Sequence, residues 1–207
     1  MWYKLNTITN PVLKKIWEER KKKNGETLDD NYRRVANYIA RDNDEAQEFY
    51  NVISDGLFLP AGRTMSNCGI GDNLTLNNCF VAPQIPDDLK SIFDTVKLGA
   101  VTHKAGGGIG YDFSLLRPAG TATSNDAIAS GPVSFMEVFN TQTSTILQGN
   151  RRGANMGVMN IYHPDIEQFI TAKTTQGKFE HFNLSVMVDD AFMEAMQNNQ
   201  DVYLHYP

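Results

Sequence analysis

The sequence predicts an α/β fold with a mainly parallel sheet, preceded by a small helical N-terminal segment. From about residue 57, short apolar runs alternate with segments whose apolar residues recur at helical spacing. Strands and helices that alternate in this way form βαβ units with parallel strands. Residues 1–55 instead show only helical periods and hold ten of the 19 Lys and Arg residues. We therefore expect two parts, residues 1–55 and residues 56–207.

Short amphipathic helices are expected in residues 1–55. Their apolar faces are Val12, Ile16 and Trp17, then Tyr32, Val35, Ala36 and Ile39, then Phe49, Val52 and Ile53. Asp44 is the expected N-cap of the last of these helices, and Gly56 is its expected C-terminal stop.

Five strands and four helices are expected after residue 57. The expected strands are residues 79–82, 108–113, 156–161, 182–188 and 202–206. The expected helices begin after Asp87 or Asp88, at Pro132 with Ser130 as cap, at Pro164 and at Ala191. The second of these helices is expected to stop at Gly149. Because the last predicted strand has no helix after it, the predicted sheet is unfinished.

Composition excludes several classes of protein. Hydrophobic residues make up 41% of the chain and charged residues 21%, which is typical of a globular fold. No apolar run reaches the roughly 18 residues of a membrane span, and the N-terminus lacks the apolar core of a signal peptide, so we expect a cytoplasmic protein. The net charge of -5 argues against a broad nucleic-acid surface. Two cysteines, Cys68 and Cys79, and four scattered histidines predict neither a disulfide scaffold nor a metal site.

Four glycines lie within five residues at positions 106–110, between a predicted helix and a predicted strand. Phosphate-binding glycine loops run in the opposite direction, from strand to helix, so these glycines form neither a P-loop nor a dinucleotide-binding turn. They indicate close approach of the backbone to another chain segment or to a ligand, and tight packing is the favoured interpretation.

Two polar loops and one cysteine are further candidates for a site. Residues 148–155 carry Arg151 and Arg152 between glycines, and a planar guanidinium group suits a phosphate or a base edge. Residues 117–130 are rich in small polar side chains, as in a flexible ligand-binding loop. Cys79 opens a predicted strand, and strand ends often carry sites in α/β proteins. Ordinary surface loops and a buried structural thiol are the alternatives.

Taken together, these segments resemble the catalytic chain of ribonucleotide reductase, particularly its class II, adenosylcobalamin-dependent branch. The segments that carry the resemblance are LPAGRTM at 59–65, NCFV at 78–81, HKAGGGIGYDFS at 103–114, SGPVSF at 130–135, RRGANMG at 151–157, HPDI at 163–166 and FNLSV at 182–186. They cover nearly everything after residue 55. The resemblance implies a ten-stranded α/β barrel of two half-barrels, of which this chain would supply the first.

The resemblance implies that Cys79 is one of two redox cysteines that reduce the ribose 2′ position. Loss of a hydroxyl as water needs two electrons and a proton donor, and a dithiol that closes to a disulfide supplies both. Cys68 is expected to be a structural thiol. The implied substrate contacts are Gly62, Arg63, Thr64, Asn78 and Asn155.

The resemblance also implies a site for a deoxynucleoside triphosphate effector with Mg²⁺. The implied effector residues are Asp87, Asp88, Leu89, Ile92, Arg117, Gln148, Arg151 and Arg152. The helices at 88–103 and 132–147 would pair with their copies in a homodimer, and the loop at 148–155 would carry effector identity to the substrate base.

The implied function is radical-based reduction of ribonucleotides to deoxyribonucleotides, with a dithiol as reductant. The family's thiyl-radical cysteine and second redox cysteine are absent from this sequence, and adenosylcobalamin would be bound mainly by a C-terminal half that this chain needs for activity. The alternatives are a non-catalytic deoxynucleotide-binding module, a fragment of a class I large subunit, and a plain structural α/β domain.

Overall fold

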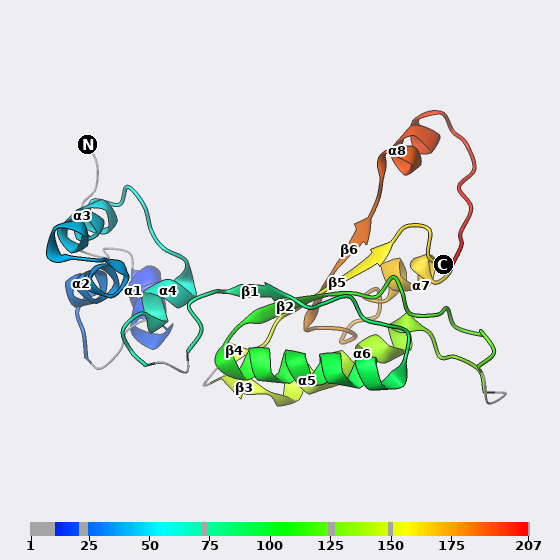
Figure 1. Cartoon of the computed structure of the whole chain (residues 1–207), viewed down its shortest axis with the longest axis horizontal. Coiled ribbons are helices and arrows are strands. Elements are labelled where there is room, and N and C mark those ends of the chain that lie inside the picture. The colour runs from blue at the N-terminus through cyan, green and yellow to red at the C-terminus, as the bar shows by residue number, and fades with distance from the viewer. Residues whose placement is uncertain (1–10, 21–24, 72–73, 124–126, 149–150, 207) are drawn as a thin grey trace. The chain divides into compact units, whose positions relative to one another are not determined.

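The computed structural model describes residues 11–20, 25–71, 74–123, 127–148 and 151–206 (Figure 1). The chain divides into two compact units, Met1–Asn78 and Cys79–Pro207, and each is described by itself. Among the described residues, no helix is both long enough and apolar enough to cross a membrane.

The described part of the first unit is helical. Its helices are α1 (Pro11–Arg20), α2 (Leu28–Ile39), α3 (Asn43–Ser54) and α4 (Gly62–Asn67). The sequence patterns predicted helices in the regions of α1, α2 and α3 but did not predict α4, which has only six residues. Because α4 packs against α2, the first unit continues past the change in composition at residue 56.

Side-chain caps determine where α2 and α3 begin. The Thr27 hydroxyl accepts the N–H of Asp30 at 3.1 Å, and the Asp30 carboxylate accepts the N–H of Thr27 at 2.9 Å, which makes a capping box. The helix α3 begins after Asp42, whose carboxylate accepts the N–H of Glu45 at 2.9 Å. The prediction that Asp44 caps this helix is wrong, because Asp44 already lies in its first turn.

The apolar faces of α2 and α3 meet in a small core. Tyr32, Val35 and Ile53 are buried there together with Cys68. Burial raises the pKa of the Cys68 thiol, as expected for a structural cysteine. The prediction that Ile39 belongs to this core is wrong, since it ends α2 and is 42% exposed.

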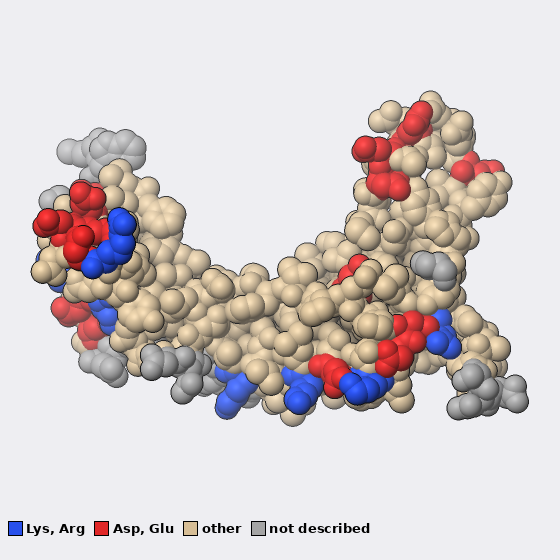
Figure 2. Space-filling model, viewed as in Figure 1, with Lys and Arg blue, Asp and Glu red and all other residues tan. Residues whose placement is uncertain are grey.

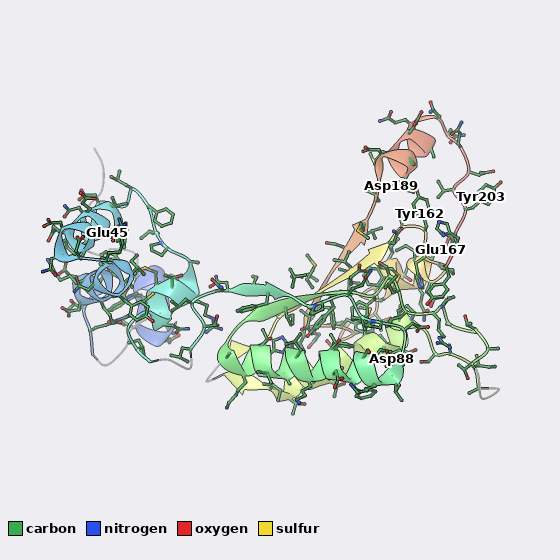
Figure 3. All side chains as sticks on the ribbon, in the orientation of Figure 1. Glu45, Asp88, Tyr162, Glu167, Asp189 and Tyr203 are labelled. Carbon is green, nitrogen blue, oxygen red and sulfur yellow. The ribbon has the colours of Figure 1, made fainter. Side chains whose placement is uncertain are left out.

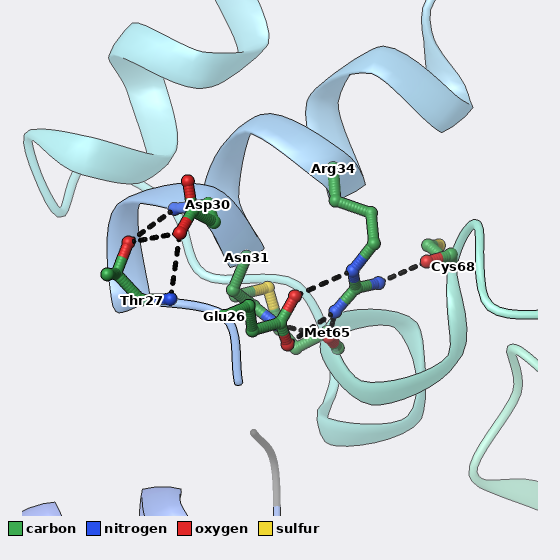
Figure 4. A network of polar contacts seen from close by, with 7 residues as sticks. All are labelled: Glu26, Thr27, Asp30, Asn31, Arg34, Met65 and Cys68. Atoms are coloured by element: carbon green, nitrogen blue, oxygen red, sulfur yellow. Dashed lines mark hydrogen bonds and ion pairs between the residues drawn. The ribbon is translucent and has the colours of Figure 1, made fainter. Parts of the chain in front are cut away.

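A partly buried ion pair ties α2 to α4 (Figure 4). Arg34 Nε donates to Glu26 Oε2 at 2.9 Å, and the same guanidinium group donates to the carbonyls of Met65 and Cys68. Asn31 Nδ2 donates to the Met65 carbonyl at 2.9 Å and to Glu26 Oε1 at 3.0 Å. The Arg34 and Glu26 side chains are only 17% and 10% exposed. Since these carbonyls belong to the end of α4, the network holds α4 in place.

The second unit is built around a four-stranded parallel sheet. Its strands are β1 (Cys79–Val81), β2 (Gly108–Asp112), β5 (Asn155–Asn160) and β6 (Phe182–Met187), in the order β1-β2-β5-β6. All three strand pairs are parallel, which confirms the predicted α/β fold and four of the five predicted strands. Within the described residues, β1 and β6 each have one neighbour, so both edges of the sheet are open.

Four helices and a small two-stranded ladder complete the second unit. The helices are α5 (Leu89–Ala105), α6 (Pro132–Thr145), α7 (Ile166–Thr171) and α8 (Asp190–Gln197). The ladder pairs β3 (Leu147–Gln148) with β4 (Arg151–Arg152) in antiparallel register. The helices α5 and α6 pack together against one face of the sheet (Figure 1).

The beginnings and ends of α5 and α6 confirm part of the sequence analysis. Asp88 caps α5, and its carboxylate accepts the N–H of Ser91 at 2.9 Å. Pro132 opens α6 as predicted, but the residue before it, Gly131, occupies the N-cap position that was predicted for Ser130. The helix ends at Thr145 rather than at Gly149, because the next residues enter β3; Gly149 itself lies outside the described residues.

The segment at 202–206, predicted as a fifth strand, forms no strand. The N–H of His205 donates to the Tyr162 carbonyl at 2.7 Å, and the Tyr206 hydroxyl donates to the Leu115 carbonyl at 2.7 Å. The Tyr162 hydroxyl donates in turn to the Asp189 carboxylate at 2.8 Å, and both residues are labelled in Figure 3. The segment is thus held by separate hydrogen bonds to loops and not by pairing at the sheet edge.

An aromatic cluster forms the centre of the main core. The Tyr111 ring packs edge-on against Phe139 with 4.7 Å between centroids, and Phe113 and Phe182 complete the cluster. The Tyr111 hydroxyl is buried without a hydrogen-bond partner among the described residues. It lies directly against the α5 backbone at Gly99, where a Cβ atom would overlap it.

We expect Arg34→Met to lower the free energy of unfolding by about 3 kcal/mol, because it leaves Glu26 buried without its partner. Arg41→Met is the matched control, since Arg41 pairs with Glu45 while its own side chain is 86% exposed, and it should change stability little. Urea unfolding followed by circular dichroism measures both variants. Equal losses in the two variants would contradict the structural role of the network.

We expect Tyr111→Phe to leave stability unchanged or to raise it by about 1 kcal/mol, because the removed hydroxyl is buried without a partner. Gly99→Ala should cost about 2 kcal/mol through overlap with that hydroxyl. The double variant should recover most of the loss, because the overlapping atom is gone. Urea unfolding of the three variants checks this, and a Gly99→Ala cost that is the same in both backgrounds would refute it.

Candidate functional site

The sheet has a covered face and an uncovered face. Successive residues of a strand point to opposite faces, so successive rows of paired residues alternate between the two faces. One row consists of Phe80, Ile109, Asn155 and Phe182. The next row consists of Val81, Gly110, Met156 and Asn183. The first row packs toward α5 and α6, whereas Val81 is 88% exposed and Met156 is 39% exposed. Within the described residues, the second face is therefore uncovered.

Cys79 lies on the uncovered face. It pairs with Gly108 and stands two residues before Val81, so its side chain shares the face of Val81. Its thiol is exposed, whereas the Cys68 thiol is buried in the first unit. The interpretation of Cys79 as a buried structural thiol is therefore wrong. As the first residue of β1, Cys79 lies at the amino end of its strand, so the rule that sites gather at the carboxyl ends of strands does not account for it.

The glycine cluster includes a tightly packed position, as the favoured interpretation predicts, and its approach to a ligand stays a prediction. Gly107 allows close packing, because a Cβ there would lie 2.5 Å from the Phe80 ring. Gly110 lies on the uncovered face, where a Cβ would make only ordinary contacts, the nearest at 3.7 Å from Met156 Cβ. Gly108 and Gly110 therefore leave the surface of the sheet next to β1 without side chains.

Sequence reasoning missed polar residues on the same face. Asn183 and Ser185 in β6 lie in the rows of Met156 and Val158, and the Ser185 hydroxyl is 3.7 Å from the Met156 sulfur. The signal was present in the segment FNLSV, where polar and apolar residues alternate with the period of a strand. Asn183 and Ser185 could donate hydrogen bonds to a ligand on this face.

The predicted substrate residues of the first unit lie together at α4. Gly62, Arg63 and Thr64 form its first turn, and the N–H of Arg63 donates to Asn78 Oδ1 at 3.0 Å. The Thr64 hydroxyl donates to the Leu76 carbonyl at 3.1 Å. The structure therefore brings Asn78 next to Arg63, as expected if both serve one site.

Asp87 and Arg117, two of the predicted effector residues, bind each other. Arg117 Nε donates to Asp87 Oδ2 at 2.6 Å, and the N–H of Arg117 donates to Asp87 Oδ1 at 3.1 Å. The neighbouring Asp88 caps α5, at the helix end labelled in Figure 3. The hydrogen bonds from Ser91, its side chain first, hold the pKa of the Asp88 carboxyl below its usual value. Both carboxylates thus already have structural partners.

The two apolar residues among the predicted effector residues differ in their exposure. Leu89 is 63% exposed on α5, whereas Ile92 is buried in the core. Phe93 and Val101 on the same helix are 48% and 60% exposed. Figure 2 shows mainly basic side chains along α5, and one of them, Lys90, pairs with Asp94 at 2.6 Å. The outer surface of α5 therefore combines exposed apolar residues with partly neutralised charge.

The remaining effector residues lie at the other end of α5. Gln148 pairs with Arg151 in the β3–β4 ladder, and the side chains of Gln148, Arg151 and Arg152 lie outside the described part of the structure. The ladder adjoins His103, near the C-terminal end of α5, because the residue after β4, Gly153, packs on the His103 ring. Since α5 has 17 residues, about 25 Å separates its two ends. One chain therefore does not bring the two groups of effector residues together.

The loop at 117–130 is a hairpin at its base. The N–H of Gly120 donates to the Ala129 carbonyl at 2.9 Å, and the N–H of Ala129 donates to the Thr121 carbonyl at 2.8 Å. Asp165 accepts the N–H of Ala119 at 2.8 Å and so fixes the start of the loop. Residues 124–126 lie outside the description, so a role of the loop in ligand binding stays a prediction.

A buried polar group lies where α5, α6 and β5 meet. Asn155, predicted to contact substrate, is 2% exposed on the covered face, and its Nδ2 donates to the Thr143 hydroxyl at 2.7 Å. His103 is also 2% exposed, and its Nδ1 lies 3.3 Å from Gln142 Nε2. Burial lowers the pKa of His103, against the opposing effect of the Ala154 carbonyl and the Asn155 side chain.

The described residues hold no cluster of metal-binding side chains, and the sheet edge beside Cys79 is open. No group of three His, Cys, Asp or Glu side chains among them lies close enough together to hold a metal ion. The surface beside Cys79 is open at the β1 edge and, within its unit, is not enclosed by described residues.

Fold and site together define a class of protein, an open parallel α/β sheet that is covered on one face by helices and carries a thiol on the other. Family profiles match both units of the chain. Residues 16–73 match the all-alpha domain of ribonucleotide reductase, and residues 77–207 match its barrel domain. The chain belongs to the ribonucleotide reductase large-subunit family.

Curated relatives support this assignment. Vitamin B12-dependent ribonucleoside-diphosphate reductases from Thermoplasma acidophilum and Mycobacterium tuberculosis are 44% and 45% identical, over 77% and 74% of this chain. The ribonucleoside-diphosphate reductase large subunit of Vaccinia virus is 31% identical over 80% of the chain. The matched regions are 21% or 22% of these relatives, so the chain spans about a fifth of their length.

A solved structure supports the fold. The alpha subunit of the class Id ribonucleotide reductase of Actinobacillus ureae superposes with a TM-score of 0.78, covering 92% of this chain and 35% of that one at 24% identity. At this identity the likeness concerns the fold alone.

We expect the stability of the chain to fall as the pH drops below about 6.5, the usual pKa of a histidine. The folded chain holds His103 at a lowered pKa, so the unfolded chain binds the proton more tightly and acid favours unfolding. Urea midpoints at pH 7.5, 6.5 and 5.5 measure this, and His103→Gln should flatten the dependence. His205→Gln is the control at an exposed histidine, and an equal flattening there would exclude His103 as the cause.

Proposed function

We propose that this chain supplies one redox cysteine, part of the substrate site and the specificity-effector site of a class II ribonucleotide reductase. The observation that carries the proposal is the exposed Cys79 thiol on the uncovered face of the sheet. Family membership supports the reaction, and the relatives named as vitamin B12-dependent support class II, because they share 44% to 45% identity against 31% for the Vaccinia virus subunit.

In the proposed reaction, two thiols reduce the ribose of a ribonucleotide. The C2′–O bond breaks and a C2′–H bond forms, while two thiols lose two electrons and two protons and form one disulfide. One proton leaves with the hydroxyl as water, and the other proton and the two electrons form the new C2′–H bond. Cys79 is one of the two thiols. The second must come from a further polypeptide segment, since the other cysteine of this chain, Cys68, is fully buried in the first unit. A dithiol reductant then restores both thiols.

We propose substrate-binding residues for each unit by itself. Gly62, Arg63, Thr64 and Asn78 contribute from the first unit, where Asn78 Oδ1 already accepts the Arg63 N–H. From the second unit we add Asn183, because it shares the uncovered face with Cys79. Asn155 lies on the opposite face, so its contact with substrate stays a prediction.

The proposed effector site lies at a homodimer interface. Two copies of α5 related by a two-fold axis perpendicular to the helix run antiparallel, so the Arg117 end of one helix would meet the β3–β4 end of its partner. This pairing would unite the effector residues that one chain holds about 25 Å apart. The exposed Leu89, Phe93 and Val101 on α5 supply apolar surface for the contact.

We further propose that a C-terminal half completes the barrel and binds most of the adenosylcobalamin. The open edges at β1 and β6 support this, because unpaired strand edges are surfaces for further strands. Mg²⁺ would arrive with the effector phosphates. The proposed setting is the cytoplasm.

A class I large subunit is the second candidate, favoured by the Vaccinia virus relative, which is named as a large subunit. Reduction that needs a separate radical-generating subunit, and not adenosylcobalamin, would select it. Saturable deoxynucleotide binding without any reduction would select the non-catalytic module.

The test combines this chain with the C-terminal half of a related reductase, adenosylcobalamin, a ribonucleotide and a dithiol. We expect Cys79→Ser to abolish deoxyribonucleotide formation, since serine cannot close a disulfide, while the circular dichroism spectrum stays unchanged. Product chromatography measures the reaction.

Cys68→Ala is the matched control for this test. It should keep the turnover of the wild type and lose only thermal stability, because Cys68 is buried in the first unit. Turnover by Cys79→Ser at the wild-type rate would overturn the assignment of the redox cysteine.

A further inference from the structure

Four polar side chains form a buried group at the base of the β3–β4 ladder. His103 comes from the last turn of α5, Gln142 and Thr143 come from the last turn of α6, and Asn155 is the first residue of β5. His103, Thr143 and Asn155 are each at most 2% exposed. The chain enters the ladder just after α6 and leaves it just before β5, so both ends of the ladder begin at this group.

The donor and the acceptor can be assigned in each hydrogen bond of the group. Gln142 Nε2 donates to His103 Nδ1 at 3.3 Å, which leaves the imidazole proton on Nε2. Asn155 Nδ2 donates to the Thr143 hydroxyl at 2.7 Å, and that hydroxyl donates to the Phe139 carbonyl at 2.8 Å. The Thr143 hydroxyl is thus both acceptor and donor, and it ties Asn155 to α6.

No hydrogen bond connects the Gln142–His103 pair to the Asn155–Thr143 pair. This missing His103–Asn155 hydrogen bond is called the open link below. Neither His103 Nε2 nor Asn155 Oδ1 has a hydrogen-bond partner among the described residues, although one is a donor and the other an acceptor. The Ala154 carbonyl and, after it, the Asn155 side chain act on His103, since both oppose the lowering of the histidine pKa by burial. Buried polar groups without partners cost stability, so a small movement that closes this link is favourable.

The imidazole ring is also in direct contact with the backbone that leaves the ladder. A Cβ atom on Gly153 would lie 2.5 Å from His103 Cγ and 2.8 Å from Nδ1, so the ring occupies the space of a side chain. Gly153 follows β4 at once, and any shift of the ring therefore displaces the end of the ladder. A movement of the His103 ring that closes or opens the polar link would therefore also move β4.

We propose that His103, Gln142, Thr143 and Asn155 are positioning residues that set the conformation of the β3–β4 ladder and thereby determine how strongly a bound nucleotide effector changes substrate preference. This inference rests on the proposed function for its second half. None of the four residues needs to touch the nucleotide. They act through the ladder, because Gly153 at its end packs directly on the His103 ring.

Thr143→Val tests the proposal, because it keeps the shape of the side chain and removes the hydroxyl that holds Asn155. Thr143→Ser restores the hydroxyl. Thr145→Val is the matched control, since the Thr145 hydroxyl bonds the Thr141 carbonyl at 2.8 Å on the exposed side of the same helix. Amide hydrogen exchange on the full chain without nucleotide measures the ladder. The reductase completed with a C-terminal half measures the fold-change in substrate preference caused by each deoxynucleoside triphosphate.

We expect Thr143→Val to speed exchange in residues 147–152 and to reduce the effector-induced change in preference roughly five- to tenfold, with turnover in the absence of effector unchanged. Thr143→Ser and Thr145→Val should behave as the wild type. Unchanged exchange in the ladder, or faster exchange spread evenly over the second unit, would overturn the proposal. If the wild type bound no deoxynucleotide, the proposed function would fail, and the exchange result alone would still decide the positioning role.

Discussion

The parallel register of the four strands is the constraint on which the other features of the second unit depend. It places Cys79 next to Gly108 and carries Val81, Gly110 and Met156 onto the same face. Because side chains alternate along a strand, a shift of one residue in β1 would move the Cys79 sulfur under α5 and α6. The aromatic core on the covered face holds this register, and the exposure of the thiol follows from it.

The helix α5 connects the two regions to which the effector was assigned. Its first turn is fixed by the Asp88 cap and lies beside the Asp87–Arg117 pair, and its last turn carries His103 under the β3–β4 ladder. Because the helix is rigid, a displacement of one end also moves the other end. The same helix exposes apolar residues on its outer side, and the proposed dimer and the proposed effector response therefore depend on one element.

Much of the fold could be predicted from local sequence signals. Apolar runs located four strands, and the Asp88 cap and Pro132 located the starts of α5 and α6. The errors arose where the signal was short or where contacts distant in sequence decided the outcome. Asp42 caps α3 in place of the predicted Asp44, which lies two residues further along the chain. The apolar residues near 202–206 suggested a strand, although this segment forms its hydrogen bonds with loops. The six-residue α4 has no period long enough to detect, and it is held by Arg34 from another helix.

The sequence by itself determined the α/β class and the family and made Cys79 a candidate redox cysteine, since strand and helix periods and ordered motifs are properties of the chain alone. The tertiary structure decided which residues face which side of the sheet. It turned Asn155 inward to Thr143 while leaving Asn183 on the face of the thiol, and it separated the two groups of effector residues by the length of α5. The physical reason is that register and packing depend on partners far away in the sequence, which no local pattern encodes.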